Sequence, residues 1–245
     1  MAILFMACQN GPSEKIKILS DEDLDTIKTI RPVNLPEPAL FETAFIQGTT
    51  EKVSDASVNF YGINIGKLKL PSGKIIACDP LHIDEYGIPY TQVFPTGEFP
   101  VQLSIVTIKS EEVIAFARIK FSEEPVVKWD MAMLSGQSSP AEKTVDANGF
   151  SVDASTGIYM DAQAVKGLDP HDIWEKESEH ELFKEMAKHN HSDWRYTMYK
   201  FGSDNLAAFT TGFGDGRYAS YIGYDAAGKP CRLLTDFGLF NSVKN

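Results

Sequence analysis

Apolar and polar residues alternate along much of the chain from about residue 58. This period of two is typical of strands that bury one face. It predicts a hairpin over residues 58–81 that turns at 71–73, and another over 98–121 that turns at 109–112. In the second hairpin, Val101, Leu103 and Ile105 would share one face. A further strand is expected within 125–134.

The alternation stops between residues 161 and 189, where helix signals appear. Asp161 can cap a short helix that ends at Gly167. Asp169 and Pro170 then suit the start of a longer helix that runs to about His189, because proline is favoured at the first helical position. We expect this helical insertion to cover one face of a sheet.

Alternation returns in the last third of the chain, around "TGFGDGRYASYIGYD". Asp215-Gly216 between alternating apolar residues is the strongest short-range signal for a two-residue hairpin turn. With that turn, Phe213 would lie opposite Tyr218 and Phe209 opposite Ile222. A second turn is expected at 225–228. The three glycines around Asp215 would therefore serve to reverse the chain.

These patterns predict a mainly β (α+β) fold. The expected architecture is an antiparallel β sandwich or partly open barrel with a helical insertion around 161–189. Residues 58–245 would form a single mainly-β domain. Residues 1–57 would form an N-terminal tail and tether, a short helix that begins near Ser20, and a proline-rich connector.

Charge and hydropathy narrow the possible partners. The net charge of -11 at pH 7 excludes nucleic acid as an expected partner, because nucleic-acid binding needs a basic surface. No segment approaches the roughly 18 consecutive apolar residues of a transmembrane span. Any membrane attachment would therefore come through the N-terminus.

The first residues, "MAILFMAC" followed by "QNGPSEK", resemble the end of a bacterial lipoprotein signal. Cys8 would then be the lipidated first residue of a periplasmic or cell-surface protein. The apolar run is short and no positively charged region precedes it, which a start site placed too far downstream would explain. The alternative is a cytoplasmic protein with an incidental cysteine. Cys78 and Cys231 fall in expected strands and are interpreted as buried thiols, with a disulfide between them as the alternative outside the cytoplasm.

Several stretches together resemble a bacterial family of unknown function, the one numbered four-two-four-one. They are "LPSGKIIACDPL", "GEFPVQLSI", "VKWDMAML", "VDASTGIYMDAQA" and "TGFGDGRYASYIGYDAAGKPCRLLTDF". The resemblance covers about residues 60–240. The chain departs from the family's usual residues at Ser155, Ile158, Tyr159, Phe213 and Ile222. The resemblance implies an architecture and a set of positions, but no established activity.

Aspartates in these stretches are the main chemical candidates. They are Asp79, Asp153, Asp161, Asp215, Asp225 and Asp236. Most have a structural interpretation as well: Asp79, Asp215 and Asp225 suit turns, and Asp161 suits a helix cap. Asp153 and Asp236 lie at expected strand ends, where a buried carboxylate would need hydrogen-bond partners.

Trp194 and Tyr218 belong to a group of aromatic residues that suit either a recognition surface or a packed core. Histidines and cysteines show no spacing typical of a metal site, and no cofactor is indicated. The candidate ligand-binding residues are therefore Asp153, Asp161, Trp194, Asp215, Tyr218 and Asp236.

Two functional hypotheses follow. The first is a non-catalytic binding module, held at the cell surface or in the periplasm, that contacts an unknown protein or small ligand through the Asp/Tyr/Gly-rich end of the last third. The second is a hydrolase that uses Asp153, Asp215 and Asp236, with or without a divalent cation.

Overall fold

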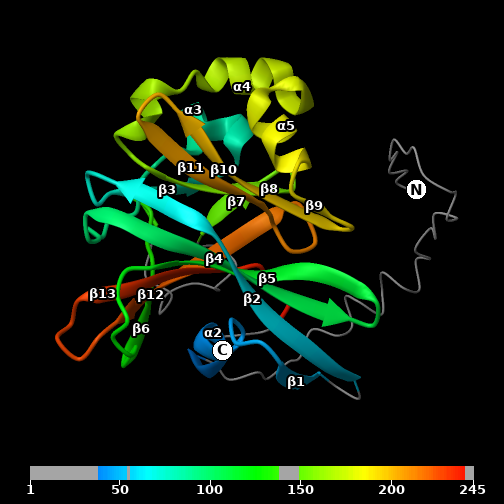
Figure 1. Ribbon diagram of the computed structural model, residues 1–245. Coiled ribbons are helices and arrows are strands. Elements are labelled where there is room, and N and C mark those ends of the chain that lie inside the picture. Colours follow the sequence, from blue (N-terminus) through cyan, green and yellow to red (C-terminus); the bar gives the residue numbers. More distant parts are fainter. Residues whose placement is uncertain (1–37, 54–55, 138–148, 241–245) are drawn as a thin grey trace, which may run out of the picture.

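The computed structural model describes residues 38–53, 56–137 and 149–240. These residues form a mainly β fold of two antiparallel sheets, one of them curled into a half-barrel, with few helices (Figure 1). The expected fold class is confirmed. Cys8 and the helix expected near Ser20 lie outside the described residues.

The larger sheet has eight strands. Its order is β1 (Thr49–Val53), β2 (Ala56–Leu70), β4 (Gly97–Ile108), β5 (Glu111–Lys120), β13 (Pro230–Asp236), β12 (Gly216–Tyr224) and β6 (Lys128–Met131), and β7 (Phe150–Val152) also pairs with β12. The strand β13 thus lies between β5 and β12. It comes last in sequence but occupies an interior position of the sheet.

The smaller sheet has five strands. Their order is β3 (Ile75–Cys78), β8 (Thr156–Asp161), β11 (Asp204–Thr210), β10 (Trp194–Phe201) and β9 (Asn190–His191). Side chains alternate between its two faces. Tyr159 and Phe209 face the larger sheet, whereas Ile158 and Met160 pack against the helices. The sheet is therefore buried on both sides.

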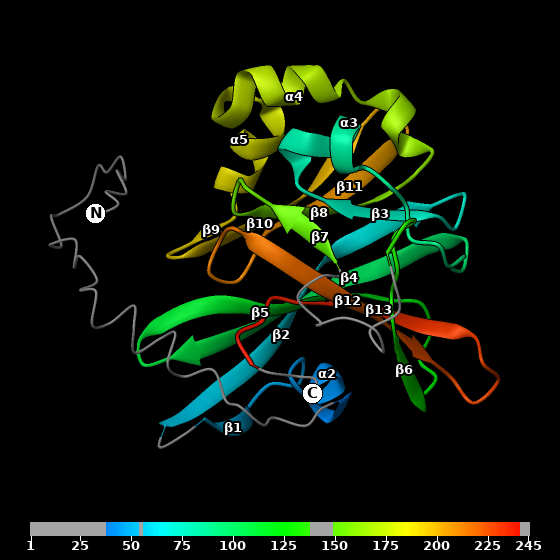
Figure 2. The same ribbon diagram turned by 180° about the vertical axis from the view of Figure 1, so that it is seen from behind.

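Helices form the outer layers. The smaller sheet is covered by α4 (Pro170–Lys176) and α5 (Glu181–Ala187), with η4 (Ala164–Gly167) and η5 (Glu177–Glu179) beside them. Two short helices, η1 (Pro80–His82) and α3 (Ile83–Tyr86), follow β3 along the chain. The short helix α2 (Pro38–Thr43) lies on the opposite face of the larger sheet from the smaller sheet (Figures 1 and 2).

The helical insertion is confirmed, but its longer helix is interrupted. Asp169 caps α4, as expected, by accepting a hydrogen bond from the N–H of Asp172. Glu177 then adopts a left-handed φ of 46°, which an α-helix does not accommodate. The chain therefore continues as η5 and restarts as α5 at Glu181, with His180 as the N-cap.

Two hairpins are confirmed. Strands β4 and β5 pair across a turn at Lys109 and Ser110, where Lys109 has a φ of 58°. Strands β12 and β13 pair across the turn at 225–228, where the N–H of Gly228 bonds to the carbonyl of Asp225. The pairing partners are those expected, but the first turn is shorter than the expected 109–112, because Glu111 and Glu112 already belong to β5.

The hairpins expected over 58–81 and across Asp215-Gly216 are wrong. Strands β2 and β3 belong to different sheets, and so do β11 and β12. Phe209 lies opposite Gly157 and Tyr196 instead of Ile222. At both places a tight turn is present but carries the chain from one sheet to the other, because strand alternation alone does not specify which strand is the partner.

A buried network of hydroxyl groups joins the two sheets. The hydroxyl of Tyr159 donates to Thr235 Oγ1 at 2.6 Å, and that of Tyr90 donates to Ser220 Oγ at 2.7 Å. Ser220 and Thr235 are themselves 2.7 Å apart. Because each buried hydroxyl finds a partner, the network fixes how the sheets are aligned without an unsatisfied polar group.

Within the described part of the chain, no helix has the length and apolar character needed to cross a membrane. The cysteines described there, Cys78 and Cys231, are buried free thiols, as the sequence indicated.

Candidate functional site

Three loops that are far apart in sequence meet at one edge of the smaller sheet. They are residues 79–82 after β3, 153–155 before β8, and 211–215 after β11, and we call them the three-loop cluster. The strands are neighbours, and the register sets Cys78 opposite Ile158 and Thr210 opposite Thr156 (Figure 2). Three of the stretches that carry the family resemblance therefore converge.

Asp79 holds two of these loops together. It is fully buried, and its Oδ1 accepts a hydrogen bond from the N–H of Leu81 at 2.8 Å. Its Oδ2 accepts from the N–H groups of Asp153 and Ala154, both at 2.7 Å. The sequence indicated the turn but not the bonds across to the second loop. The carboxylate thus acts as a fixed acceptor for backbone groups.

Asp215 fastens the third loop to the second. Its Oδ1 accepts from both the N–H and the hydroxyl of Ser155, at 2.9 and 3.0 Å. The N–H of Thr211 also donates to the carbonyl of Ser155 at 3.2 Å. Ser155 has a φ of 51°, which costs a residue with a side chain roughly 1–2 kcal/mol. The two bonds that Ser155 donates to Asp215 offset this strain.

Tyr218 supports the same loop from beneath. Its ring is buried, and its hydroxyl donates to the carbonyls of Gly214 at 2.6 Å and Thr211 at 3.3 Å. Thr211 Oγ1 donates to the Gly214 carbonyl as well, at 2.8 Å. Tyr218 therefore positions the loop that carries Asp215.

The carboxylate of Asp153 is not used to fasten the loop backbone. Its side chain is exposed, and Oδ2 lies 3.9 Å from Nε2 of His82. The ring of His82 lies 5.6 Å from that of Tyr86, which is itself exposed. Sequence reasoning missed His82 and Tyr86, although both follow Asp79 closely in the chain.

Exposed aromatic and acidic side chains thus surround the three-loop cluster. Phe213, on the same loop as Asp215, is 49% exposed. We call His82, Tyr86, Asp153, Phe213 and Asp215 the acidic–aromatic surface. It combines two carboxylates and two large apolar rings on loops whose backbone is fastened from within.

Asp161 lies apart from this cluster. It ends β8, at the opposite end of that strand from Ser155, a separation of about 20 Å at ~3.3 Å per residue. The buried carboxylate accepts from the N–H and hydroxyl of Ser72, at 2.9 and 2.8 Å, and from the N–H of Gln163 at 2.8 Å. It joins the turn after β2 to the start of the helical insertion.

Trp194 and Asp236 also have structural partners. Trp194 is buried on β10, its Nε1 donates to Glu112 at 3.3 Å, and its ring stacks on His191 with centroids 4.2 Å apart. Asp236 ends β13 and accepts from the N–H of Gly238 at 2.8 Å. Of the candidate residues, Asp153, Asp215 and Tyr218 are the ones that the cluster brings together.

Cys78, the last residue of β3, lies directly before the cluster and is a buried thiol. Burial, together with the charge of Asp79, raises the pKa of the Cys78 thiol well above its usual value, so no thiolate nucleophile is available there near neutral pH. Among the described residues, no group of three or more His, Cys, Asp or Glu side chains is placed to hold a metal ion.

Comparisons with known proteins place the chain in a family. The sequence model of the family described as "Protein of unknown function (DUF4241)" matches residues 68–235, which include all three loops of the cluster. No curated protein and no solved structure matches the chain. The match spans more than half of the sequence, so this chain is a member of the DUF4241 family.

Proposed function

We propose that this protein is a non-catalytic binding module that contacts its partner through the acidic–aromatic surface. One observation carries the proposal: Asp79 and Asp215 use their carboxylates to fasten the backbone at 153–155, while Asp153 is left exposed. Loops that are already ordered lose little entropy on binding. The surface is therefore suited to recognition.

The chemistry of the surface defines the partner class. Exposed Tyr86 and Phe213 offer large apolar contact areas, which are typical anchors of interfaces. Asp153 and Asp215 add negative charge beside them. A complementary partner is a protein segment that carries Lys or Arg next to an apolar side chain.

The test compares capture by the wild-type protein with capture by Asp153→Lys and Phe213→Ala. Each protein is immobilised and exposed to bacterial extract, and bound proteins are quantified by mass spectrometry. The dissociation constant of each purified partner is then measured. Charge reversal at Asp153 should weaken binding about 10- to 100-fold, because like charges across an interface cost several kcal/mol.

Glu124→Lys is the matched control, since it reverses an exposed charge on the loop between β5 and β6. It should leave binding unchanged. Equal binding by Asp153→Lys, Phe213→Ala and wild type would reject this surface as the contact site.

A hydrolase is the second candidate, and the Ser155–Asp215 bond beside the His82–Asp153 pair favours it. In a catalytic triad, however, the histidine bonds to the serine. Here Ser155 Oγ bonds to Asp215 directly. A panel of ester and glycoside substrates tests this hypothesis: hydrolysis that falls at least 100-fold in both Asp153→Asn and Asp215→Asn would support it over binding alone.

A further inference from the structure

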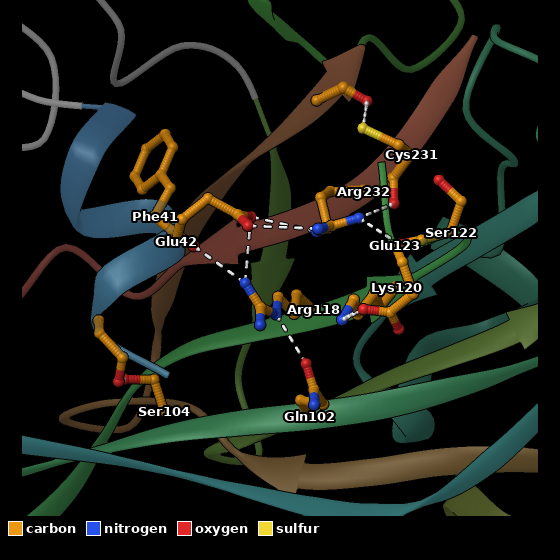
Figure 3. Close-up of polar contacts among 12 residues, drawn as sticks. Phe41, Glu42, Gln102, Ser104, Arg118, Lys120, Ser122, Glu123, Cys231 and Arg232 are labelled. Atoms are coloured by element: carbon orange, nitrogen blue, oxygen red, sulfur yellow. Dashed lines mark hydrogen bonds and ion pairs between the residues drawn. The ribbon is translucent and has the colours of Figure 1, made fainter. Parts of the chain in front are cut away.

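Two arginines lie side by side on the face of the larger sheet that α2 covers (Figure 3). Arg118 is on β5 and Arg232 on β13, and these strands are directly paired. Only 7% of Arg118 and 3% of Arg232 is exposed to solvent. Neither was singled out by the sequence, because a lone arginine in a strand gives no signal of its neighbours.

One carboxylate serves both arginines. Glu42 of α2 accepts from Arg118 Nη1 and from Arg232 Nε through Oε1, both at 3.1 Å, and from Arg232 Nη2 through Oε2 at 3.3 Å (Figure 3). The side chain of Glu42 is 34% exposed. The carboxylate end of the site is therefore open to solvent, while the guanidinium groups lie beneath it.

The remaining partners of the two arginines are neutral, and for Arg118 they include the carbonyl of Phe41 at 3.5 Å and the ring of Phe45, whose centroid lies 3.8 Å from Cζ. Arg118 Nε donates to Gln102 Oε1 at 2.8 Å, and Arg232 Nη1 donates to the carbonyls of Ser122 at 2.6 Å and Cys231 at 2.8 Å. Glu123 is nearby, but it is exposed and pairs with Lys120. The site thus holds two positive charges and one negative charge, in a protein of net charge -11.

This excess of positive charge is costly to bury. Burial lowers the pKa of Arg118 to about 10; the like charge of Arg232 adds to that shift, whereas the carboxylates of Glu42 and Glu123 oppose it. Buried charges are stable only when they are well paired. A second negative charge, or a more highly charged anion in place of the carboxylate, would complete the balance.

The arginines and the carboxylate come from different parts of the chain. Arg118 and Arg232 lie within the region that matches the family, residues 68–235, whereas α2 precedes it. Leu40 and Phe41 of α2 pack into the core beside Glu42. The helix therefore delivers a carboxylate to a cationic site that the matched region builds.

We propose that Arg118 and Arg232 form a binding site for an oxyanion, either a phosphate or a carboxylate, and that Glu42 occupies this site as a built-in competitor. Guanidinium groups bind both anions through paired N–H donors, as they bind Glu42 here. An incoming anion displaces the Glu42 side chain and loosens α2 from the sheet.

The first test removes the competitor with Glu42→Gln, which keeps the size of the side chain. Inorganic phosphate is added at pH 7 and the melting temperature is compared with that in sodium chloride of equal ionic strength. At ten times its dissociation constant, phosphate should raise Tm by about 3–5 °C in this variant and by less in wild type. Equal melting temperatures of Glu42→Gln in the two salts would overturn phosphate as the ligand.

Two further variants locate the effect. Glu42→Gln combined with Arg232→Gln should lose the response to phosphate. Glu123→Gln is the matched control, because it neutralises an exposed carboxylate and leaves Glu42 in place; its response should equal that of wild type. A response that persists without Arg232 would also overturn the proposal.

A second measurement uses wild type, so the proposal stays testable if Glu42→Gln does not fold. Phosphate should increase hydrogen exchange at the backbone amides of 40–45 relative to chloride. Unchanged protection of these amides at every phosphate concentration would count against displacement of Glu42.

A parallel titration distinguishes phosphate from a protein carboxylate as the ligand. The melting temperature of Glu42→Gln is measured with the peptide acetyl-Phe-Glu-Thr-amide, which copies residues 41–43. A response to phosphate alone identifies a small oxyanion as the ligand class. A response to the peptide identifies a protein carboxylate. Absence of both responses would overturn the proposal.

Discussion

Buried aspartates in this protein act as acceptors for backbone N–H groups that would otherwise lack a partner. Asp79 accepts three such bonds and Asp161 accepts two, plus one from a hydroxyl. A buried donor left without an acceptor costs about 1–3 kcal/mol. The first effect expected on replacing Asp79 or Asp161 is therefore a loss of folding stability.

Asp79→Ala should lower the free energy of unfolding by about 3–5 kcal/mol, because it removes the charged acceptor of three part-buried bonds from the N–H groups of Leu81, Asp153 and Ala154. Urea denaturation measures the change. Asp225→Ala is the control: Asp225 also accepts N–H bonds, at an exposed turn where water replaces it, and should cost about 1 kcal/mol or less. Equal losses would contradict the role assigned to Asp79.

Gly212 is required for close packing and not only for chain reversal. Its φ is 46°, and the Cβ of an alanine there would lie 2.8 Å from Cβ of Phe237 and 2.9 Å from Cδ1 of Leu239. At Gly228, with a φ of 73°, an added Cβ would meet nothing within 4 Å. Both glycines have a positive φ, but only Gly212 has close neighbours. Comparing alanine at the two positions therefore separates the free-energy cost of the backbone conformation from that of the steric contact.

Gly228→Ala should therefore cost only the conformational strain, about 1–2 kcal/mol. Gly212→Ala should cost about 1–3 kcal/mol more, because the loop or Phe237 must move. Thermal and urea unfolding of both variants measure the difference. If both variants lose the same stability, the close contact at Gly212 is not limiting.

At the scale of elements, the sequence predicts strands better than it predicts their partners. Alternation and the short turn that joins them together identify β4 and β5 as a pair. Alternation misplaces β3, whose residues Ile75–Cys78 are all buried, as in a strand covered on both faces. Its partner β8 lies far along the chain, so no local turn signal could identify the pair.

For the candidate site, the sequence likewise predicts some of the residues but not the contacts between them. The sequence points to Asp215 as a turn aspartate and to Asp153 as an aspartate at a strand end, both within stretches that resemble the family. Their connection through Ser155, and the roles of His82 and Asp79, depend on pairing between β3, β8 and β11. The sequence predicts chemical types, and the long-range pairing decides which of them meet.

Helix α5 contains a pH-sensitive cap. Nδ1 of His180 accepts from the N–H of Leu182 at 3.1 Å, which requires an unprotonated Nδ1. Burial lowers the pKa of His180 below 6.5; Asp172 and Glu181 oppose the shift, and Lys176 and Lys184 add to it. The neutral form is therefore the one that the folded protein favours.

A lowered pKa in the folded state means that the unfolded chain binds a proton first as the pH falls. The contribution of His180 should be complete above pH 6.5 and decrease as the pH falls below that value. Hydrogen exchange at α4 and α5, corrected for its intrinsic pH dependence, should rise between pH 7.5 and 5.5. His180→Asn caps without titrating, so an equal rise in that variant would exclude His180 as the cause.

At the scale of the whole molecule, the N-terminal sequence still predicts a lipid anchor at Cys8. Expressed from an upstream start in a bacterial host, the protein should carry a diacylglyceryl group on Cys8 and fractionate with membranes. Mass spectrometry of the native protein detects the modification. Cys8→Ser should remain in the soluble fraction, and an unmodified soluble wild-type chain would reject the prediction.

The interior position of β13 has a consequence for synthesis. Until residues 230–236 leave the ribosome, the strand that lies between β5 and β12 is missing. The side of each strand that β13 will occupy then presents an open row of amide and carbonyl groups. The half-barrel can therefore close only after translation has passed its last strand. Until then, the open edges of β5 and β12 can pair with strands of other chains.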